Sequence, residues 1–399
     1  EFQDVFTTTP PETPALVTEM KIELIEGYTL NTVEGLKRMP AGLKTSRRRH
    51  PAEWYRIAGE QIKELYEQGV IEDSSSPIAN PIHLAPKPQS NPPEMRFCLD
   101  MKMTNGITRR ENYALLGMDD FADFLTGAEP EYFAKLDLKA MYFQLPLEKD
   151  CRPLTAFDFQ GKRLQFTRVV MGTTNAVGHS QKVMATEVLG DLQLRTLFNY
   201  LDDILLPGNR TNPLFNLKNN IREVLLRFRG KGLYLHKKKC EWVQLETTFL
   251  GNKVNKKGWE IAPARKQLFS AIPQPHTTTT LRSFLGAANW LRRFLPSYAE
   301  RSKPLYAISS GPKNRRLAWT ESALAAFQDV RNLVREATFT GWLKSTGAIH
   351  LFSDASNYGF GGMLAQDQGE VYDGEKVLTP VGFYSKLFIA AQRNWSVTD

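Results

Sequence analysis

The stretch Leu197-Phe-Asn-Tyr-Leu-Asp-Asp-Ile-Leu-Leu206 decides the fold of this 399-residue chain. Apolar residues stand on both sides of an acidic pair, Asp202 and Asp203, which is typical of two buried strand arms around a tight turn. We therefore expect a hairpin whose tip carries two neighbouring carboxylates. Adjacent anions on an apolar hairpin repel each other and are costly to desolvate, so we expect a cation to compensate them.

A divalent metal ion is the cation that fits this pair best, because hard oxygen ligands suit Mg²⁺, with Mn²⁺ as a substitute. Asp137, at the C-terminal end of the strand-like run 133–138, is a further candidate ligand. Three converging carboxylates could hold two Mg²⁺ ions about 3.5–4 Å apart, as in phosphoryl transfer. Acidic turns are common, so the alternative is that Asp202 and Asp203 form a polar turn and that Asp137 is a cap.

Hydrophobic periodicity and turn residues predict the other elements. We expect helices at 51–69, 173–192, 212–228, 280–295 and 320–336. We expect strands at 81–87, 95–102, 133–138, 155–159, 164–170 and 248–254, and an antiparallel meander at 348–354, 360–364 and 381–385. This mixture predicts an α+β protein.

The composition, with 42% hydrophobic and 24% charged residues, is ordinary for a soluble globular protein and excludes disorder, collagen and coiled coil. No apolar run approaches the ~18 residues of a spanning helix, so we expect no membrane segment. Three widely spaced cysteines, Cys98, Cys151 and Cys240, predict neither a disulfide framework nor a CxxC site, which favours a reducing, intracellular compartment. The chain begins without methionine and stops within a patterned segment, so we expect a piece of a longer protein.

Positive charge is concentrated in one segment. Residues 226–320 contain 19 Lys and Arg against 4 Asp and Glu, whereas the remainder is mildly acidic. Aromatic residues such as Trp259 and Trp290 are interleaved with these charges. A solvated charged face explains a single cluster such as 237–239, but the whole segment indicates a surface for a polyanion, of which nucleic acid is the commonest.

Three motifs together carry a family resemblance: Leu136-Asp-Leu138 with Tyr142, then Tyr200-Leu-Asp-Asp203, then Phe249-Leu-Gly251. In this order they resemble the reverse transcriptase of gypsy-like LTR retrotransposons and retrovirus-like elements. Further matching segments are Ser76-Pro77, Asn80-Pro81, Met95-Arg-Phe-Cys-Leu-Asp100, Thr155-Ala-Phe157, Asn175-Ala176, Arg282-Ser-Phe-Leu-Gly286 and Leu351-Phe-Ser-Asp-Ala-Ser356. The resemblance covers nearly the whole chain and includes the start of a ribonuclease H domain.

The resemblance implies a right-hand polymerase of fingers, palm and thumb, followed by a partial ribonuclease H-like segment. Residues 1–254 would form the fingers and palm and residues 255–312 the thumb. Residues 313–345 would form a connecting helix region, and residues 346–399 the truncated N-terminal part of a ribonuclease H-like domain.

The resemblance also implies a catalytic, metal-binding triad of Asp137, Asp202 and Asp203, with Leu138 among the metal-binding positions. The implied dNTP-binding residues are Lys87, Arg96, Tyr142, Met171 and Gly172. Lys87 and Arg96 would grip the triphosphate, for which ammonium and guanidinium groups are suited, and Tyr142 would lie beneath the sugar. The alternatives are that Lys87 is a solvated strand-end lysine and Tyr142 an ordinary core residue.

Two departures from the family pattern follow the nucleotide site. Relatives commonly have Pro-Phe-Gly or Pro-Gln-Gly where this chain has Val170-Met171-Gly172, and Val177-Gly178 replaces a later proline. We expect these changes to affect fidelity and rate more than activity, because the three aspartates are intact.

The implied primer grip is Leu250-Gly251. The implied nucleic-acid-binding residues of the thumb are Lys253, Lys256, Lys257, Arg282, Arg292 and Arg293, since phosphate contact is independent of sequence. Asp354 matches the first carboxylate of a ribonuclease H site, and the glutamate that follows in the family lies beyond this chain. Ribonuclease H activity is therefore not expected from the chain alone.

The predicted function is that of an RNA- and DNA-templated DNA polymerase that extends a primer with dNTPs by a two-metal mechanism. Its partners would be RNA/DNA and DNA/DNA template-primers, in a cytoplasmic virus-like particle or virion core. The alternative is a non-catalytic scaffold subunit, in a homodimer or in a heterodimer with another Pol-derived chain. A carboxylate-pair hydrolase is disfavoured, because adjacent aspartates on one turn leave no room for a substrate bond between them.

Overall fold

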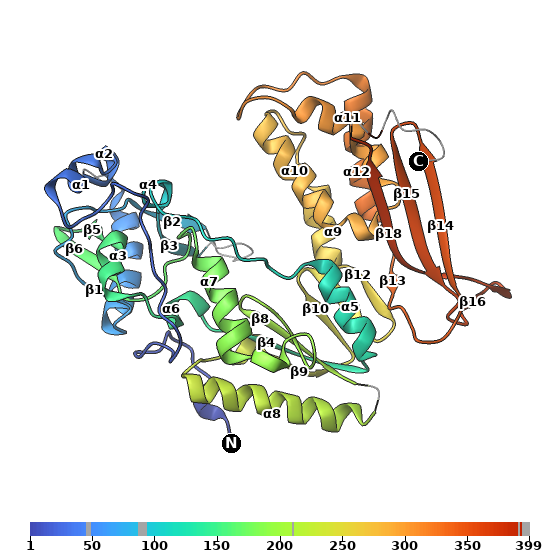
Figure 1. Ribbon diagram of the computed structural model, residues 1–399, viewed down its shortest axis with the longest axis horizontal. Coiled ribbons are helices and arrows are strands. Elements are labelled where there is room, and N and C mark those ends of the chain that lie inside the picture. Colours follow the sequence, from blue (N-terminus) through green and yellow to red (C-terminus); the bar gives the residue numbers. More distant parts are fainter. Residues whose placement is uncertain (45–48, 87–93, 210, 390–391, 393–399) are drawn as a thin grey trace. The chain divides into compact units, whose positions relative to one another are not determined.

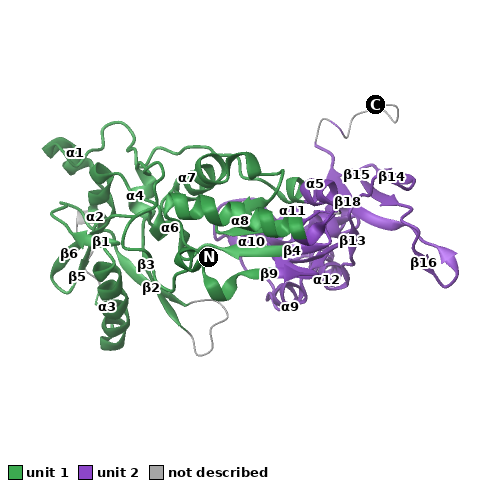
Figure 2. Cartoon of the chain, turned by 90° about the horizontal axis from the view of Figure 1, so that it is seen from below, with its two compact units in different colours: residues 1–121, 134–206, 215–242 green, residues 122–133, 207–214, 243–399 purple. Residues whose placement is uncertain are grey.

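The computed structural model describes residues 1–44, 49–86, 94–209, 211–389 and 392. The chain divides into two compact units (Figure 2). Unit 1 comprises residues 1–121, 134–206 and 215–242, and unit 2 comprises residues 122–133, 207–214 and 243–399. Within the described residues, no helix is long and apolar enough to cross a membrane.

Unit 1 combines helices with three small sheets (Figure 1). Its helices are α1 (Val33–Arg38), α2 (Ala41–Lys44), α3 (Ala52–Glu67), α4 (Lys102–Gly106), α6 (Met141–Gln144), α7 (Ala176–Val183) and most of α8 (Pro213–Lys231). Its strands are β1 (Ile71–Asp73), β2 (Ile82–Pro86), β3 (Met95–Leu99), β5 (Phe157–Phe159), β6 (Lys162–Phe166) and β7 (Phe198–Tyr200). The elements α5 (Met118–Ala128), β4 (Tyr132–Asp137), β8 (Asp203–Gly208) and β9 (Glu241–Gln244) cross the boundary between the units.

The four-stranded sheet β7-β8-β4-β9 contains the expected hairpin. Strands β7 and β8 pair antiparallel, with Phe198 opposite Leu205 and Tyr200 opposite Asp203. Helix α8 lies across one face of the sheet (Figure 1). Because both faces are covered, Phe198, Ile204 and Leu205 are completely buried, as the continuous apolar runs predicted. The tip thus stands on a rigid base.

A second core joins α3 to the sheet β1-β6-β5 and to the hairpin β2-β3. The helix begins after Pro51 and buries Ala58, Ile62 and Leu65, one stripe at helical spacing. These side chains pack with the rings of Phe97 and Phe166 and their neighbours. The predictions of a helix at 51–69 and of strands at 81–87 and 95–102 are confirmed, with ends shifted by a few residues.

The single helix expected at 173–192 is wrong. Helix α7 ends at Val183 and continues as a π-helical turn, Met184–Val188, and a short 3₁₀ turn. The Thr186 hydroxyl donates to the Lys182 carbonyl at 2.8 Å, which competes with the regular backbone bond at this point. Leu189 N–H then bonds to Met184 O, five residues back. Gly190, with φ 49°, begins the 3₁₀ turn Gly190–Leu192.

Unit 2 contains the helices α9 (Pro263–Ser270), α10 (Thr278–Trp290), α11 (Tyr298–Ser309) and α12 (Glu321–Glu336). Its strands are β10 (Glu246–Phe249), β11 (Asn252–Asn255), β12 (Gly258–Ile261), β13 (Thr340–Gly341), β14 (Ile349–Ser356), β15 (Gly359–Gln366), β16 (Val371–Tyr372), β17 (Glu375–Lys376) and β18 (Thr379–Leu387). They form the sheets β10-β11-β12-β13, β14-β15-β18 and β16-β17. The helix at 320–336 and the C-terminal meander were predicted, whereas α9 and α11 were missed.

The strand expected at 248–254 is instead a hairpin. Phe249 pairs with Asn252, so Leu250 and Gly251 form a two-residue loop between β10 and β11. Both loop residues have positive φ, 48° and 76°, which a tight hairpin turn of this kind requires. The sequence Leu-Gly weakened the turn signal, since leucine rarely adopts that conformation.

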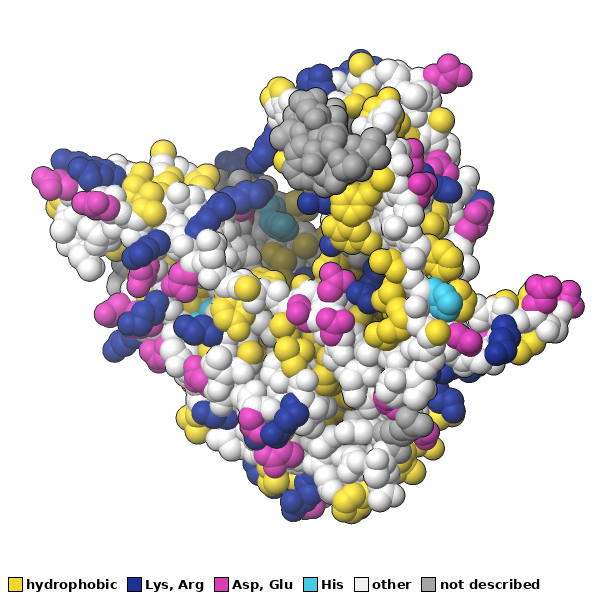
Figure 3. All heavy atoms as spheres, turned by 45° about the vertical axis from the view of Figure 1, so that its right-hand side comes forward, with side chains coloured by type: hydrophobic (Ala, Val, Ile, Leu, Met, Phe, Trp, Pro, Cys, Tyr) yellow, Lys and Arg dark blue, Asp and Glu magenta, His cyan; other side chains and the backbone are white. Residues whose placement is uncertain are grey.

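The sheet β14-β15-β18 has a largely exposed edge strand. Leu351 is 74% exposed and Phe352 48%, and β14 has no buried residue. Figure 3 shows exposed hydrophobic side chains, in yellow, among the charged ones on the face that it presents.

Candidate active site

The acidic pair lies at the tip of the β7–β8 hairpin, beside the end of β4. Leu138 N–H donates to Asp202 O at 2.9 Å, which holds the residue after Asp137 against the tip. Burial raises the pKa of Asp202, and it raises the pKa of Asp203 to about 6, with the neighbouring carboxylates adding to both shifts. The structure therefore brings Asp202 and Asp203 beside the end of β4, in a site where the charges of these two carboxylates are destabilised.

Lys239 is a site residue that the sequence analysis missed. Its ammonium lies 3.2 Å from Asp137 Oδ2, whereas the buried Asp137 Oδ1 accepts no hydrogen bond. The positive charge of Lys239 opposes the rise in the pKa of Asp202 and Asp203 but does not cancel it. In the sequence it belongs to a run of three lysines, 237–239, that suggested only a solvated or polyanion-binding face.

The donor set fits a hard divalent cation, but the carboxylates are not gathered around one point. Within the described residues, no group of three or more His, Cys, Asp or Glu side chains has metal-binding geometry. Asp137 is turned to Lys239 instead. The unpaired Asp137 Oδ1 and the raised pKa values of the pair show that one ammonium does not satisfy the site.

Three of the five predicted nucleotide residues line one cavity of about 400 Å³ in unit 1. Arg96, Tyr142 and Met171 border it together with Leu138, Asp202 and Lys239. Burial is the main cause of the raised pKa of Tyr142. Met171 is 48% exposed, so its side chain is available to a ligand. Lys87 lies outside the described residues.

Gly172 follows this cavity and is fixed from outside it. It has φ 92°, a conformation that favours glycine. The Asn105 side chain donates to Gly172 O at 2.7 Å and accepts from Thr174 N–H at 2.9 Å. The loop that carries Met171 is therefore anchored by Asn105 just after Met171, outside the cavity.

Comparison with known proteins agrees with this arrangement. Residues 76–254 match the family of reverse transcriptases (RNA-dependent DNA polymerases), and residues 319–399 match the RNase H-like domain found in reverse transcriptase. The chain contains a reverse transcriptase domain. The predicted resemblance is confirmed.

Relatives of this reverse transcriptase domain are Pol polyproteins of LTR retrotransposons. The Pol polyprotein of transposon 412 from Drosophila melanogaster is 27% identical over 85% of this chain, and the Tf2-3 polyprotein of Schizosaccharomyces pombe is 26% identical over 85%. The chain spans 26% and 24% of the lengths of these two relatives.

Solved structures of foamy viral protease-reverse transcriptase share the fold at 20% identity. The superposition on the complex with RNA/DNA hybrid has a TM-score of 0.72 and covers 99% of this chain and 49% of the foamy viral chain. The complex with dsDNA has a TM-score of 0.69 and covers 96% of this chain and 74% of its own. The predicted α+β right-hand polymerase fold with an RNase H-like part is confirmed.

The implied primer grip of the reverse transcriptase, Leu250-Gly251, is the tip of the β10–β11 hairpin. Arg265 Nη1 donates to Leu250 O at 2.7 Å. A Cβ on Gly251 would lie 2.4 Å from the same Arg265 nitrogen, so only glycine lets the guanidinium close over the turn. Arg265 therefore stabilises this hairpin tip through its hydrogen bond to the turn. Burial of the guanidinium lowers the pKa of Arg265.

The six predicted nucleic-acid-binding residues differ in whether their charged groups already have partners within the protein. Lys253 pairs with Glu246, Lys257 pairs with Glu370, and Arg282 donates to Ser309 O and Gly311 O. Arg293 lies over the Trp259 ring at 5.8 Å. Lys256 and Arg292 are exposed and have no carboxylate partner among the described residues. These two are the best candidates for phosphate contact.

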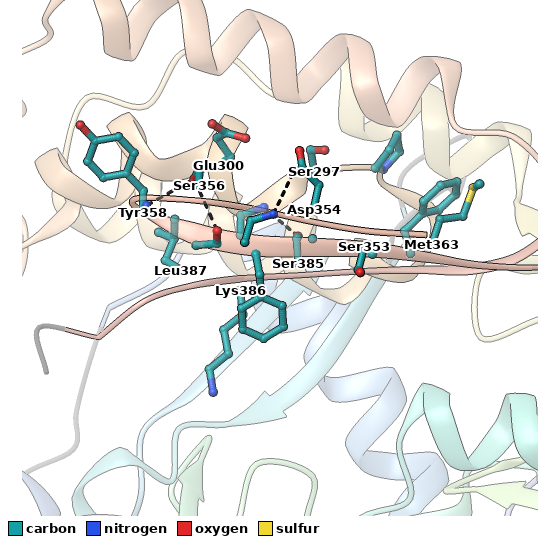
Figure 4. Close-up of a pocket in the computed structure, with 18 of the residues that line it drawn as sticks. Ser297, Glu300, Ser353, Asp354, Ser356, Tyr358, Met363, Ser385, Lys386 and Leu387 are labelled. Carbon is teal, nitrogen blue, oxygen red and sulfur yellow. Dashed lines mark hydrogen bonds between the residues drawn. The ribbon is translucent and has the colours of Figure 1, made fainter. Parts of the chain in front are cut away.

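Asp354 lines a separate cavity of about 350 Å³ in unit 2, between the start of α11 and the strands β14, β15 and β18. Its Oδ1 accepts from Ala355 N–H at 2.9 Å. Figure 4 shows Asp354 and Glu300 on the same side of the strands, with Lys386 pointing to the other side. These two acids are fewer than the several carboxylates that a paired-metal hydrolase uses. Absence of ribonuclease H activity remains a prediction.

We predict that Asp203→Asn stabilises the metal-free protein. An acid whose pKa rises from 3.8 to about 6 on folding disfavours the folded state fully above pH 6 and not at all below pH 3.8. The substitution should therefore raise the free energy of unfolding by about 2 kcal/mol at pH 7, measured by urea denaturation, and the gain should fade between pH 6 and pH 4.

Asp191→Asn is the matched control, because the pKa of Asp191 is lowered, chiefly by its hydrogen bond with Arg227. It should give no gain at pH 7. A gain for Asp203→Asn that is equal at pH 4 and pH 7 would contradict the electrostatic origin.

We predict that Lys256→Ala with Arg292→Ala weakens duplex binding without regard to sequence. If each side chain contacts one phosphate, the slope of log affinity against log salt should fall by about 0.9 per contact, so by ~2 for the pair. Fluorescence anisotropy with two unrelated duplexes checks this. The double variant Lys218→Ala and Arg222→Ala on α8 is the control, and an equal loss there would mean that only net charge matters.

Proposed function

We propose that this chain is an RNA- and DNA-templated DNA polymerase that extends a primer with dNTPs. The observation that carries the proposal is the convergence in unit 1 of Asp202, Asp203 and the end of β4 beside a cavity lined by Arg96 and Tyr142. The intact triad favours catalysis over a scaffold role in a dimer. The nucleic acids in the complexes of the structural relatives, RNA/DNA hybrid and dsDNA, support template-primer as the substrate.

The residues that would hold two Mg²⁺ ions are Asp137, Asp202 and Asp203, with the Leu138 backbone beside them. When bound, these ions would stabilise the attacking and leaving oxygens of the phosphoryl transfer. The chain's own contribution is to hold Asp202 and Asp203 at the hairpin tip beside the end of β4 and to bury all three carboxylates at least in part. Lys239 would have to release Asp137 for the full ligand set to form.

The remaining residues would orient the nucleotide. Arg96 offers a planar guanidinium that is suited to phosphate oxygens. Tyr142 lies in the same cavity and would form the wall beneath the sugar. Lys87, outside the described residues, would add a second cation. The Met171 side chain, which is apolar, would make only a weak contact with the nucleotide.

The domain limits given above, with fingers and palm at 1–254, thumb at 255–312, connecting region at 313–345 and RNase H-like part at 346–399, form part of the proposal. Because the relatives are retrotransposon Pol polyproteins, we also propose action within a cytoplasmic virus-like particle. Leu250-Gly251 would support the primer end.

We predict that Asp202→Asn abolishes primer extension on RNA and DNA templates, because it removes a charged metal ligand. Binding of template-primer should persist, since the basic residues of unit 2 are unchanged. Gel-based extension with Mg²⁺, repeated after chelation, measures the first, and anisotropy measures the second.

Asp191→Asn is the control for this assay, because Asp191 is paired with Arg227 and Arg195 and lines no part of the cavity. Extension by Asp202→Asn within tenfold of the unmodified chain would show that the metal assignment is wrong.

A further inference from the structure

Two buried amides lie directly under the acidic tip. Gln181 on α7 is 2% exposed and Asn199 on β7 is completely buried. Gln181 Nε2 donates to Asn199 Oδ1 at 3.0 Å and to Asn199 O at 3.2 Å. Gln181 Oε1 accepts from Leu201 N–H at 2.7 Å. The helix is thereby tied to the first residue of the turn.

Asn199 completes the clamp from the strand side. Its Nδ2 donates to Leu201 O at 2.8 Å and, at 3.5 Å, to Asp203 O. Both peptide groups of Leu201 are therefore held, one by each amide. Apart from the bonds between the two amides, their side chains bond to the backbone of Leu201 and Asp203, the residues on either side of Asp202.

Leu201 needs such a clamp because of its backbone conformation. Its φ is 56°, the left-handed region that residues with side chains avoid. A conformation of this kind persists only where the surrounding structure fixes it, and such positions gather at functional sites. Without the clamp, the turn would relax and the carboxylates of Asp202 and Asp203 would point elsewhere.

We propose that Gln181, acting through Asn199 and Leu201, is a positioning residue that sets the direction of the two carboxylates toward metal. Gln181 lines no part of the cavity beside the tip. The inference rests on the proposed function for its kinetic consequences and on the proposed metal site for its metal-binding consequence. Groups that orient metal ligands typically change metal affinity or activity by about 10–100-fold.

Gln181→Leu tests the proposal, since it keeps the volume and removes every hydrogen bond. The value of kcat for extension should fall by ~10–100-fold, and the Mg²⁺ concentration for half-maximal rate should rise by about tenfold. The Kd for template-primer should stay unchanged. Gln181→Glu keeps the acceptor for Leu201 N–H and loses the donors, so it should lie between Gln181→Leu and the unmodified chain.

The second readout needs no activity. Mn²⁺ binding to the chain without nucleic acid, followed by electron paramagnetic resonance, should weaken by about tenfold in Gln181→Leu. Asn80→Leu is the matched control, because Asn80 is 1% exposed and its Nδ2 donates to Leu154 O and Ala156 O, far along the chain from the tip. It should lose stability with no change in Mn²⁺ affinity or Mg²⁺ dependence.

Each outcome separates the two claims. Unchanged Mn²⁺ affinity and Mg²⁺ dependence in Gln181→Leu would overturn the positioning role. If Gln181→Leu does not fold, unchanged values in Gln181→Glu would overturn it equally. If the unmodified chain binds Mn²⁺ but extends no primer, the proposed function fails, and weaker Mn²⁺ binding in Gln181→Leu would still support the clamp.

Discussion

The main physical constraint on the site is the repulsion among carboxylates that lie close together at the edge of a buried sheet. The rest of the structure has to offset this unfavourable energy. Burial raises the pKa of both Asp202 and Asp203, so the folded state is destabilised by their charges at neutral pH. Each pKa unit corresponds to about 1.4 kcal/mol. Complete burial of large side chains such as Phe198 and Leu205, each worth roughly 1.5–3 kcal/mol, offsets that cost.

A cation and two buried amides stabilise the site against this repulsion in different ways. Lys239 lies against Asp137 and compensates part of the charge, while Gln181 and Asn199 fix the backbone of the turn. The first interaction is electrostatic and can be exchanged for a stronger cation. The second is a buried hydrogen-bond network, which is costly to break because its groups would lose their partners. The site is thus rigid in its backbone and exchangeable in its charge compensation.

The sequence predicted the parts of the site that repeat a pattern. The apolar arms around Asp202 and Asp203 indicated a hairpin, and the ordered motifs indicated the family and its right-hand fold. It did not indicate Lys239, which lies in an ordinary basic run, or Gln181, whose partner is eighteen residues away. A single buried amide has no periodicity, and its role depends on a tertiary contact. The π-helical turn after α7 was not predicted for a similar reason, because a local bond such as that of the Thr186 hydroxyl to Lys182 O leaves no periodic signal in the sequence.

The central claim is that the three aspartates form a metal site whose charge Lys239 compensates before metal enters. A crystal structure of the chain soaked in Mn²⁺, with anomalous diffraction at the manganese edge, tests this most directly. The account predicts a peak bounded by carboxylate oxygens of Asp137, Asp202 and Asp203, with the Lys239 ammonium no longer at 3.2 Å from Asp137. No peak at the tip, with that ion pair intact at saturating Mn²⁺, would contradict the account.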